Sequence, residues 1–485
     1  MLLLVACGGV DGSDGSATAS PTTDLATEST TAESTADGDP PGTTTTGDTT
    51  SLPTTGAELP PPAATIEEAL DSIPGLNWIE RPSKVEGYRS FVLSYRQPID
   101  HDQPDGPNFF QDITLMHRHQ DAPMVLSTEG YALDKGDQRL AEPASLLHAN
   151  YLEVEHRFFG GSLSHQSDWS PLTIEQAAAD HHRITVALKQ AFYRAPWLST
   201  GISKGGMTAT YFRRFYPDDV VGTVAYVAPL SHGIADPRYW PFIEGRVPPC
   251  TQKLVALARE VLLRRDTMLS YVENEAWKAG YDYTLVTADQ ALELSAINLP
   301  FSFWQYQKAD QCDGLPTPAA DDGKVWQFLQ RVGPPNFYRD EYLTTYEPYY
   351  WQAARQLGAP GTDESAFADL LLYPGLDLPT TFIWPDKTPE FDPEAMQDLA
   401  AWMDSEATAM LFIYGENDPW TAGAYAADPG HDVHRFIAPG GNHLSTIADL
   451  SEADRARVYE RLEAWAGATP LVRPLPVPLP VRAPL

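Results

Sequence analysis

A serine flanked by glycines is the first feature of this sequence with an evident chemistry. Residues 201–205 read GISKG and fit the pattern G-x-S-x-G, in which a strand turns sharply into a helix and presents a nucleophilic serine. A strand-like run at residues 197–200 precedes the pattern, and a helical segment at residues 207–215 follows it. We therefore predict that Ser203 is a nucleophile for acyl transfer.

An acid that follows a strand is the second part of such a site. A serine hydroxyl becomes a good nucleophile when a base removes its proton and an acid orients that base, and here the acid is expected to precede the histidine in the chain. The apolar run at residues 410–414 leads into YGENDPW at residues 414–420. Asp418 lies deeper in this turn, beside the rigid Pro419, so Asp418 is the predicted acid and Glu416 the second choice.

Three histidines remain downstream of this acid as candidates for the base. They are His431, His434 and His443. Only the last one follows a strand-like run, at residues 434–438, in the glycine-rich loop PGGNH, where a side chain reaches the carboxyl edge of a parallel sheet. The predicted triad is therefore Ser203, Asp418 and His443.

Acyl transfer also needs N–H groups that face the developing oxyanion. The backbone N–H of Lys204, the residue after the nucleophile, is one expected donor. The second should come from the loop after an early strand, and STEGY at residues 127–131 ends the strand-like run at residues 123–127. We expect the amide of Gly130 or of Tyr131 to be this donor. The alternative is a tight loop without a catalytic role.

The elements that must position these residues alternate along the chain. Strand-like runs lie at residues 88–97, 112–119, 123–127, 150–156, 197–200, 220–227, 410–414 and 434–438. Helical spacing is found at residues 174–192, 207–215, 254–265, 267–278 and about 451–465. Long helices and many aromatic residues dominate residues 232–391. The pattern predicts a mostly parallel sheet covered on both faces and interrupted by a helical insertion.

Both ends of the chain have compositions that do not build a core. Residues 11–60 contain 21 Ser or Thr and neither Lys nor Arg, which predicts disorder. Six prolines among residues 470–485 favour an extended tail. We expect five segments along the chain. They are a tether at 1–65, a first core part at 66–231, an inserted cap at 232–391, a second core part at 392–469 and a tail at 470–485.

Charge excludes one class of partner. The formal net charge is −33, and residues 61–485 alone carry 57 acidic and 33 basic side chains. Such a surface repels a polyanion, so nucleic acid is not an expected partner. No stretch of 18 apolar residues exists, so no transmembrane helix is predicted.

The three cysteines permit several interpretations. Residues 4–7 read LVAC and resemble the lipobox of bacterial lipoproteins, which implies export and a lipid anchor through Cys7 at the cell envelope. Only six residues precede Cys7 and none is basic, so an ordinary disordered tail is the alternative. Cys250 and Cys312 form either a disulfide or two separate thiols.

Several motifs together resemble one family. They are FVLSY at 91–95, PIDH at 98–101, EGY at 129–131, VEHRFFG at 154–160, GISKGGMT at 201–208, YGENDPW at 414–420 and APGGNH at 438–443. They look like the motifs of secreted bacterial prolyl tri/tetrapeptidyl aminopeptidases, serine peptidase family 37, over residues 82–465. The resemblance implies an α/β-hydrolase fold with an inserted, mainly helical cap. EHR at 155–157 is also similar to the related lysosomal Pro-X carboxypeptidases and dipeptidyl peptidases, which differ in the chain end they read.

The resemblance implies a serine exopeptidase that releases tri- or tetrapeptides from free amino termini by cleavage after proline. A free α-ammonium group needs a carboxylate in a partly dry site, and Glu129 and Glu155 are the candidates. The alternative for either is a structural ion pair, for example Glu155 with Arg157. His117 and His119 share one strand face without a third ligand, so neither a metal nor a cofactor is predicted.

Two other functions remain open at this point. The same triad serves ester hydrolysis, because a fold does not determine a substrate, so an esterase or lipase is the first alternative. A non-catalytic binding protein on the same scaffold is the second, and the intact Ser203, Asp418 and His443 argue against it.

Overall fold

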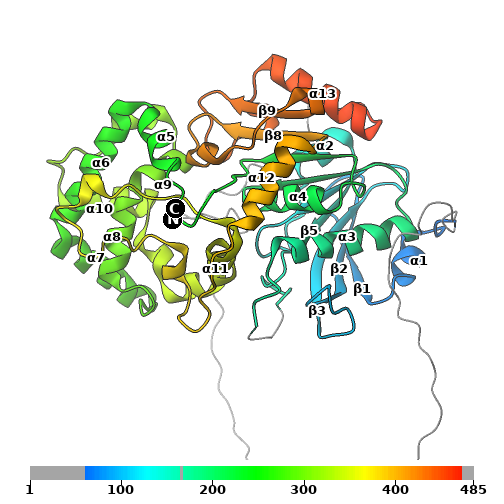
Figure 1. Cartoon of the computed structure of the whole chain (residues 1–485), viewed down its shortest axis with the longest axis horizontal. Helices are drawn as coiled ribbons and strands as arrows, with labels where there is room; N and C mark the ends of the chain where they lie inside the picture. The colour runs from blue at the N-terminus through cyan, green and yellow to red at the C-terminus, as the bar shows by residue number, and fades with distance from the viewer. Residues whose placement is uncertain (1–60, 164–167, 472–485) are drawn as a thin grey trace, which may run out of the picture.

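The computed structural model describes residues 61–163 and 168–471 (Figure 1). The predicted disordered stretch at residues 11–60, Cys7 with its lipobox-like context, and nearly all of the proline-rich tail lie outside the described residues.

A nine-stranded sheet forms the centre of the described part of the chain, with the order β1-β2-β3-β5-β4-β6-β7-β8-β9. Its strands are β1 Leu76–Arg81, β2 Arg89–Pro98, β3 Asn108–His117, β4 Met124–Thr128, β5 Asn150–Val154, β6 Trp197–Ile202, β7 Gly222–Tyr226, β8 Met410–Gly415 and β9 Val433–Ala438. The pairs from β1 to β5 are antiparallel, and those from β5 to β9 are parallel. The carboxyl ends of β4, β6, β8 and β9 therefore share one edge.

Helices cover both faces of this sheet (Figure 1). One face packs on α1 Ile66–Asp71, α3 Ile174–Ala191, α4 Lys204–Phe215 and α12 Glu394–Ser405, and the other on α2 Glu142–Leu147 and α13 Glu452–Ala466. Alternate residues of one strand show this division, because Val125 packs with α2 and α13 whereas Leu126 packs with α1 and α3. Strands buried on both faces favour apolar sequence, which β8 has along its length and β4 has in its first three residues, before Ser127 and Thr128. The architecture confirms the predicted α/β-hydrolase fold.

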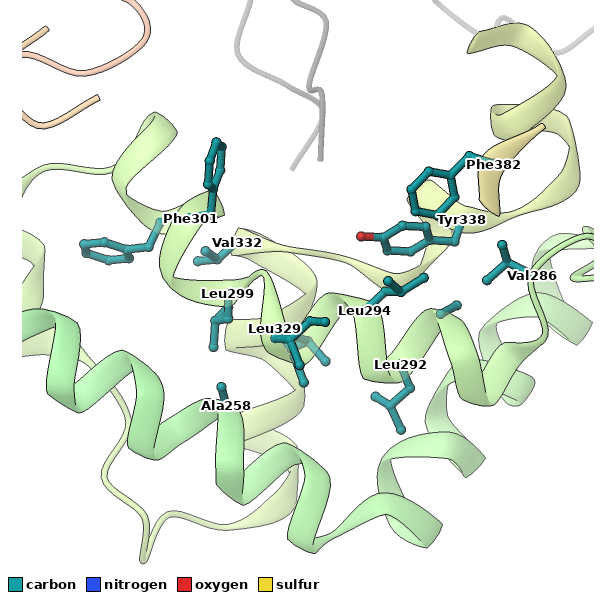
Figure 2. Close-up of a cluster of buried hydrophobic side chains, with 14 of the residues drawn as sticks. Ala258, Val286, Leu292, Leu294, Leu299, Phe301, Leu329, Val332, Tyr338 and Phe382 are labelled. Atoms are coloured by element: carbon teal, nitrogen blue, oxygen red, sulfur yellow. The ribbon is translucent and has the colours of Figure 1, made fainter. Parts of the chain in front are cut away.

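The chain between β7 and α12 forms a separate helical layer, drawn in green and yellow at the left of Figure 1. Its helices are α5 Tyr239–Gly245, α6 Pro248–Leu263, α7 Arg265–Ala279, α8 Ala288–Ile297, α9 Leu299–Tyr306, α10 Asp322–Val332 and α11 Asp340–Gln352. We call residues 239–352 the cap. Figure 2 shows its core, where Ala258, Leu292, Leu299 and Leu329 converge from four helices.

A disulfide joins two segments of the cap. Cys250 of α6 is bonded to Cys312, which lies in the 3₁₀ turn Ala309–Gly314, and the two Cα atoms are 5.5 Å apart. The structure thus selects the disulfide over two separate thiols. Within the described residues, no helix combines the length and apolar composition that crossing a membrane requires.

Candidate active site

The turn between β6 and α4 places Ser203 at the carboxyl edge of the sheet. Ser203 has φ 56° and ψ −123°, a backbone conformation that residues other than glycine rarely adopt. Its N–H donates to the Tyr226 carbonyl at 2.8 Å. A methyl group on Gly201 would overlap the backbone of Gly205, and one on Gly205 would overlap the Thr128 carbonyl. The glycines are therefore needed because strand and helix approach each other so closely.

The three residues of the predicted triad lie in one hydrogen-bonded chain. His443 Nε2 is 2.9 Å from Ser203 Oγ, and His443 Nδ1 is 2.8 Å from Asp418 Oδ2. Asp418 also accepts the Trp420 N–H at 3.1 Å and is fully buried, and burial raises the pKa of its carboxyl. In this order the imidazole can take the serine proton while the carboxylate stabilises the resulting imidazolium.

The loop that carries His443 is attached to the cap. The His443 N–H donates to the Gln305 carbonyl of α9 at 3.0 Å, and Asn442 Nδ2 donates to the Gln307 carbonyl at 3.5 Å. The rings of Tyr306 and Trp420 lie 6.1 and 6.0 Å from the imidazole. The cap thus helps to hold the His443 imidazole beside Ser203.

Glu416, the second choice for the acid, has a different position. Its Oε2 accepts the Gly440 N–H at 2.7 Å, at the start of the loop that leads to His443. The carboxylate that contacts His443 is that of Asp418, so Glu416 supports the loop.

The loop after β4 lies against the start of α4. A methyl group on Gly130 would be 2.7 Å from Lys204 Cβ, so no larger residue fits there. Within the described residues, the amides of Gly130, Tyr131 and Lys204 donate to no acceptor. The Lys204 amide and both candidates for the second donor are therefore not engaged by another acceptor in the described part of the chain, and their role at the oxyanion stays a prediction.

Glu129 is paired with a second acid that the sequence did not reveal. Ser127 Oγ donates to Glu129 Oε1 at 3.4 Å, and Ser127 is opposite Glu153 in the β4–β5 register. The two carboxyls interact, and burial raises the pKa of both, which favours one shared proton over two free anions. Binding of an amino terminus by Glu129 stays a prediction.

Glu155 has a structural position. Its carboxylate accepts the N–H groups of Leu133 and Ser162, each at 2.7 Å, and the residue is 1% exposed. The structure therefore does not support the expected contact with a substrate. The alternative pairing with Arg157 is wrong, because the Arg157 guanidinium binds both oxygens of Asp180, at 2.7 and 3.0 Å. Contact of Glu155 with a substrate stays untested.

Aromatic side chains from the cap extend to the loop after β4. The ring of Tyr131 contacts Tyr346 and Tyr349 of α11, with ring centres 5.7 and 5.8 Å apart. These three rings form an aromatic wall, and the contact of the cap residues with Tyr131 depends on how the cap folds over the sheet edge. Within the described residues, no cluster of three or more His, Cys, Asp or Glu side chains could hold a metal ion.

Comparison with known proteins gives matches over nearly the whole chain. Residues 59–476 match the family description PS-10 peptidase S37. Prolyl tri/tetrapeptidyl aminopeptidase of Streptomyces mobaraensis is 39% identical over 427 residues, which cover 87% of this chain and 89% of that protein. Lysosomal Pro-X carboxypeptidase of Mus musculus is 29% identical over 188 residues, 35% of this chain and 38% of that protein.

Solved structures that match this chain have lower sequence identity to it. Proline iminopeptidase of Mycobacterium smegmatis is 13% identical, with a TM-score of 0.34, and the match covers 80% of this chain and 99% of that chain. A score this low carries no argument, so the fold assignment rests on the strand order and on the turn at Ser203.

Proposed function

Because the chain belongs to the PS-10 peptidase S37 family, we propose that it is a serine exopeptidase that cleaves after proline and releases tri- or tetrapeptides from free amino termini. One observation carries the proposal: the hydrogen-bonded chain Ser203–His443–Asp418 at the nucleophile turn. The similarity to the Streptomyces mobaraensis protein supplies the expected substrate class.

The geometry supports the following steps for the proposed reaction. Ser203 Oγ attacks the carbonyl carbon of the proline residue while its proton passes to His443 Nε2, 2.9 Å away. Backbone amides beside Ser203 stabilise the oxyanion. The C–N bond then breaks, the leaving amine takes the proton from His443, and the acyl group stays on Ser203. Water, activated by the same imidazole, releases the peptide and restores the serine.

The surroundings of the triad support a substrate with a compact apolar ring. Tyr306 and Trp420 contact His443, and Tyr131 forms part of the aromatic wall described above. Such rings provide apolar area at small conformational cost, which suits proline. The acidic folded part also favours a substrate with a positive amino end.

The test uses an Ala-Ala-Pro chromogenic amide with a free amino terminus, its succinylated form and a short-chain ester. Wild type should cleave the free peptide far faster than the succinylated one, and Ser203→Ala should lose this activity. Cleavage of the ester alone would identify an esterase, cleavage of both peptides equally would exclude recognition of the amino terminus, and no cleavage would contradict catalysis.

A further inference from the structure

The side chain of Lys204 is buried beside the nucleophile and extends to the loop after β4. Its Nζ donates to the Gly130 carbonyl at 2.8 Å and lies 5.4 and 5.3 Å from the ring centres of Tyr131 and Phe159. The residue is 2% exposed, and within the described residues it forms no ion pair with a carboxylate. Burial accordingly lowers the pKa of this amine well below its ordinary value.

A buried amine without a counter-ion lowers the stability of the folded protein. An apolar side chain of the same length would fill the space without the desolvation cost. Stability therefore does not explain a lysine at this position, whereas its single polar contact, with the Gly130 carbonyl, does suggest a role.

The contact with Gly130 also determines where a neighbouring N–H points. A trans peptide is planar, and its C=O and N–H lie on opposite sides of the bond. No cis peptide occurs in the described residues, so fixing the Gly130 carbonyl fixes the direction of the Tyr131 N–H. That N–H donates to no acceptor within the described residues.

We propose that Lys204 is a positioning residue for the oxyanion site, acting through both of its nitrogens. Its backbone N–H is one donor to the oxyanion, and its side chain holds the peptide whose Tyr131 N–H is the other. One residue next to the nucleophile thereby aligns both donors. This inference rests on the proposed acyl transfer at Ser203.

Lys204→Met tests this role, because methionine keeps the length and apolar stem of lysine and removes the donor. For the free Ala-Ala-Pro amide, kcat should fall about 10–100-fold with KM within about 3-fold, since loss of a whole oxyanion donor costs about 10²–10³-fold. An Ala-Ala-Pro aldehyde, whose adduct carries the oxyanion, should bind correspondingly more weakly. Binding of the tripeptide Ala-Ala-Pro should change less than about 3-fold.

Thr208→Val is the matched control in the same helix. It removes a buried hydrogen bond, from Thr208 Oγ1 to the Lys204 carbonyl at 2.9 Å, and keeps the Lys204 side chain that donates to Gly130. Its kcat should stay within about 3-fold of wild type. Lys204→Arg, which keeps a donor, should retain more activity than Lys204→Met.

Three results would overturn the inference. They are an unchanged kcat in folded Lys204→Met, equal weakening of aldehyde and tripeptide, and failure of both Lys204→Met and Lys204→Leu to fold, which would make the lysine a structural requirement. If wild type hydrolyses only the ester, the proposed specificity fails, and the same comparison on the ester still tests Lys204. If wild type hydrolyses neither substrate, both proposals fail.

Discussion

The backbone of Gly205 packs directly against the backbone of Thr128, so the start of α4 contacts the end of β4. A methyl group on Gly205 would overlap the Thr128 carbonyl oxygen, and the same Thr128 donates its hydroxyl to the Gly205 carbonyl at 2.7 Å. Two chain segments 77 residues apart thereby fix the distance between the nucleophile and the loop after β4.

Gly205→Ala should therefore damage the site as well as the fold. We expect the free energy of unfolding to fall by about 1–3 kcal/mol from overpacking. We also expect kcat to fall by at least about 10²-fold, because small displacements of reacting groups are costly. Chemical denaturation and kinetics measure the two effects. Gly245→Ala, at a glycine with open space around it, should change stability by less than about 1 kcal/mol.

Asp418→Asn and Glu416→Gln should show which of the two carboxylates acts on His443. In Asp418→Asn the amide cannot stabilise an imidazolium, so kcat should drop by about 10³–10⁴-fold while the protein stays folded. Glu416→Gln retains an oxygen for the Gly440 N–H and should stay within about 3-fold of wild type. Comparable losses in both variants would contradict the assignment of Asp418.

Glu153→Gln should change how stability depends on pH. Burial raises the pKa of Glu153 well above its ordinary value of 4.5, and the Glu129 carboxyl raises it further. The folded chain therefore keeps a proton that the unfolded chain releases. The free energy of unfolding should decline as pH rises above about 4.5, by at most about 1.4 kcal/mol per pH unit for this group.

In Glu153→Gln this decline should be shallower, so the variant should gain stability relative to wild type on going from pH 5 to pH 8. Thermal unfolding across this range measures the difference. Glu406→Gln on the surface of the protein should parallel wild type. Parallel curves for all three proteins would contradict a buried, protonated pair.

Reduction of Cys250–Cys312 should destabilise the cap. The disulfide closes a 62-residue segment, for which chain entropy predicts a contribution of about 4 kcal/mol. The double variant Cys250→Ser/Cys312→Ser should unfold at a lower temperature than wild type. A reducing agent should lower the unfolding temperature of wild type only. An effect of equal size on the double variant would point to a different cause.

The hydrogen-bonded chain of Ser203, His443 and Asp418 could be predicted from sequence because each residue lies in a recognisable local context. Ser203 lies in a short pattern, Asp418 follows the apolar strand β8, and His443 follows β9 in the required order. The α/β architecture was predictable for the same reason, since β8 consists of apolar residues and β4 begins with three of them. β1 escaped prediction because an edge strand with mostly exposed side chains has little apolar pattern.

Contacts between distant segments were not predictable in this way. The pairing of Glu129 with Glu153 requires the register of β4 on β5, and the position of Glu155 requires the fold of the loop at Ser162. The reach of the Lys204 side chain to Gly130 likewise appears only once β4 and α4 are in contact. Charge and spacing in the sequence identify candidate site residues, whereas the packing of strands and loops against one another decides which of these side chains are buried.

The hydrogen bond between the His443 amide and the Gln305 carbonyl makes the position of the His443 imidazole depend on an insertion far away in sequence. A shortened chain that joined β7 directly to α12 would keep the sheet and the nucleophile turn, yet the loop bearing the imidazole would have lost its contacts with the cap. The cap is thus not an exchangeable module for specificity. Engineering that grafts it onto, or removes it from, such a core has to supply a new acceptor for that one N–H group.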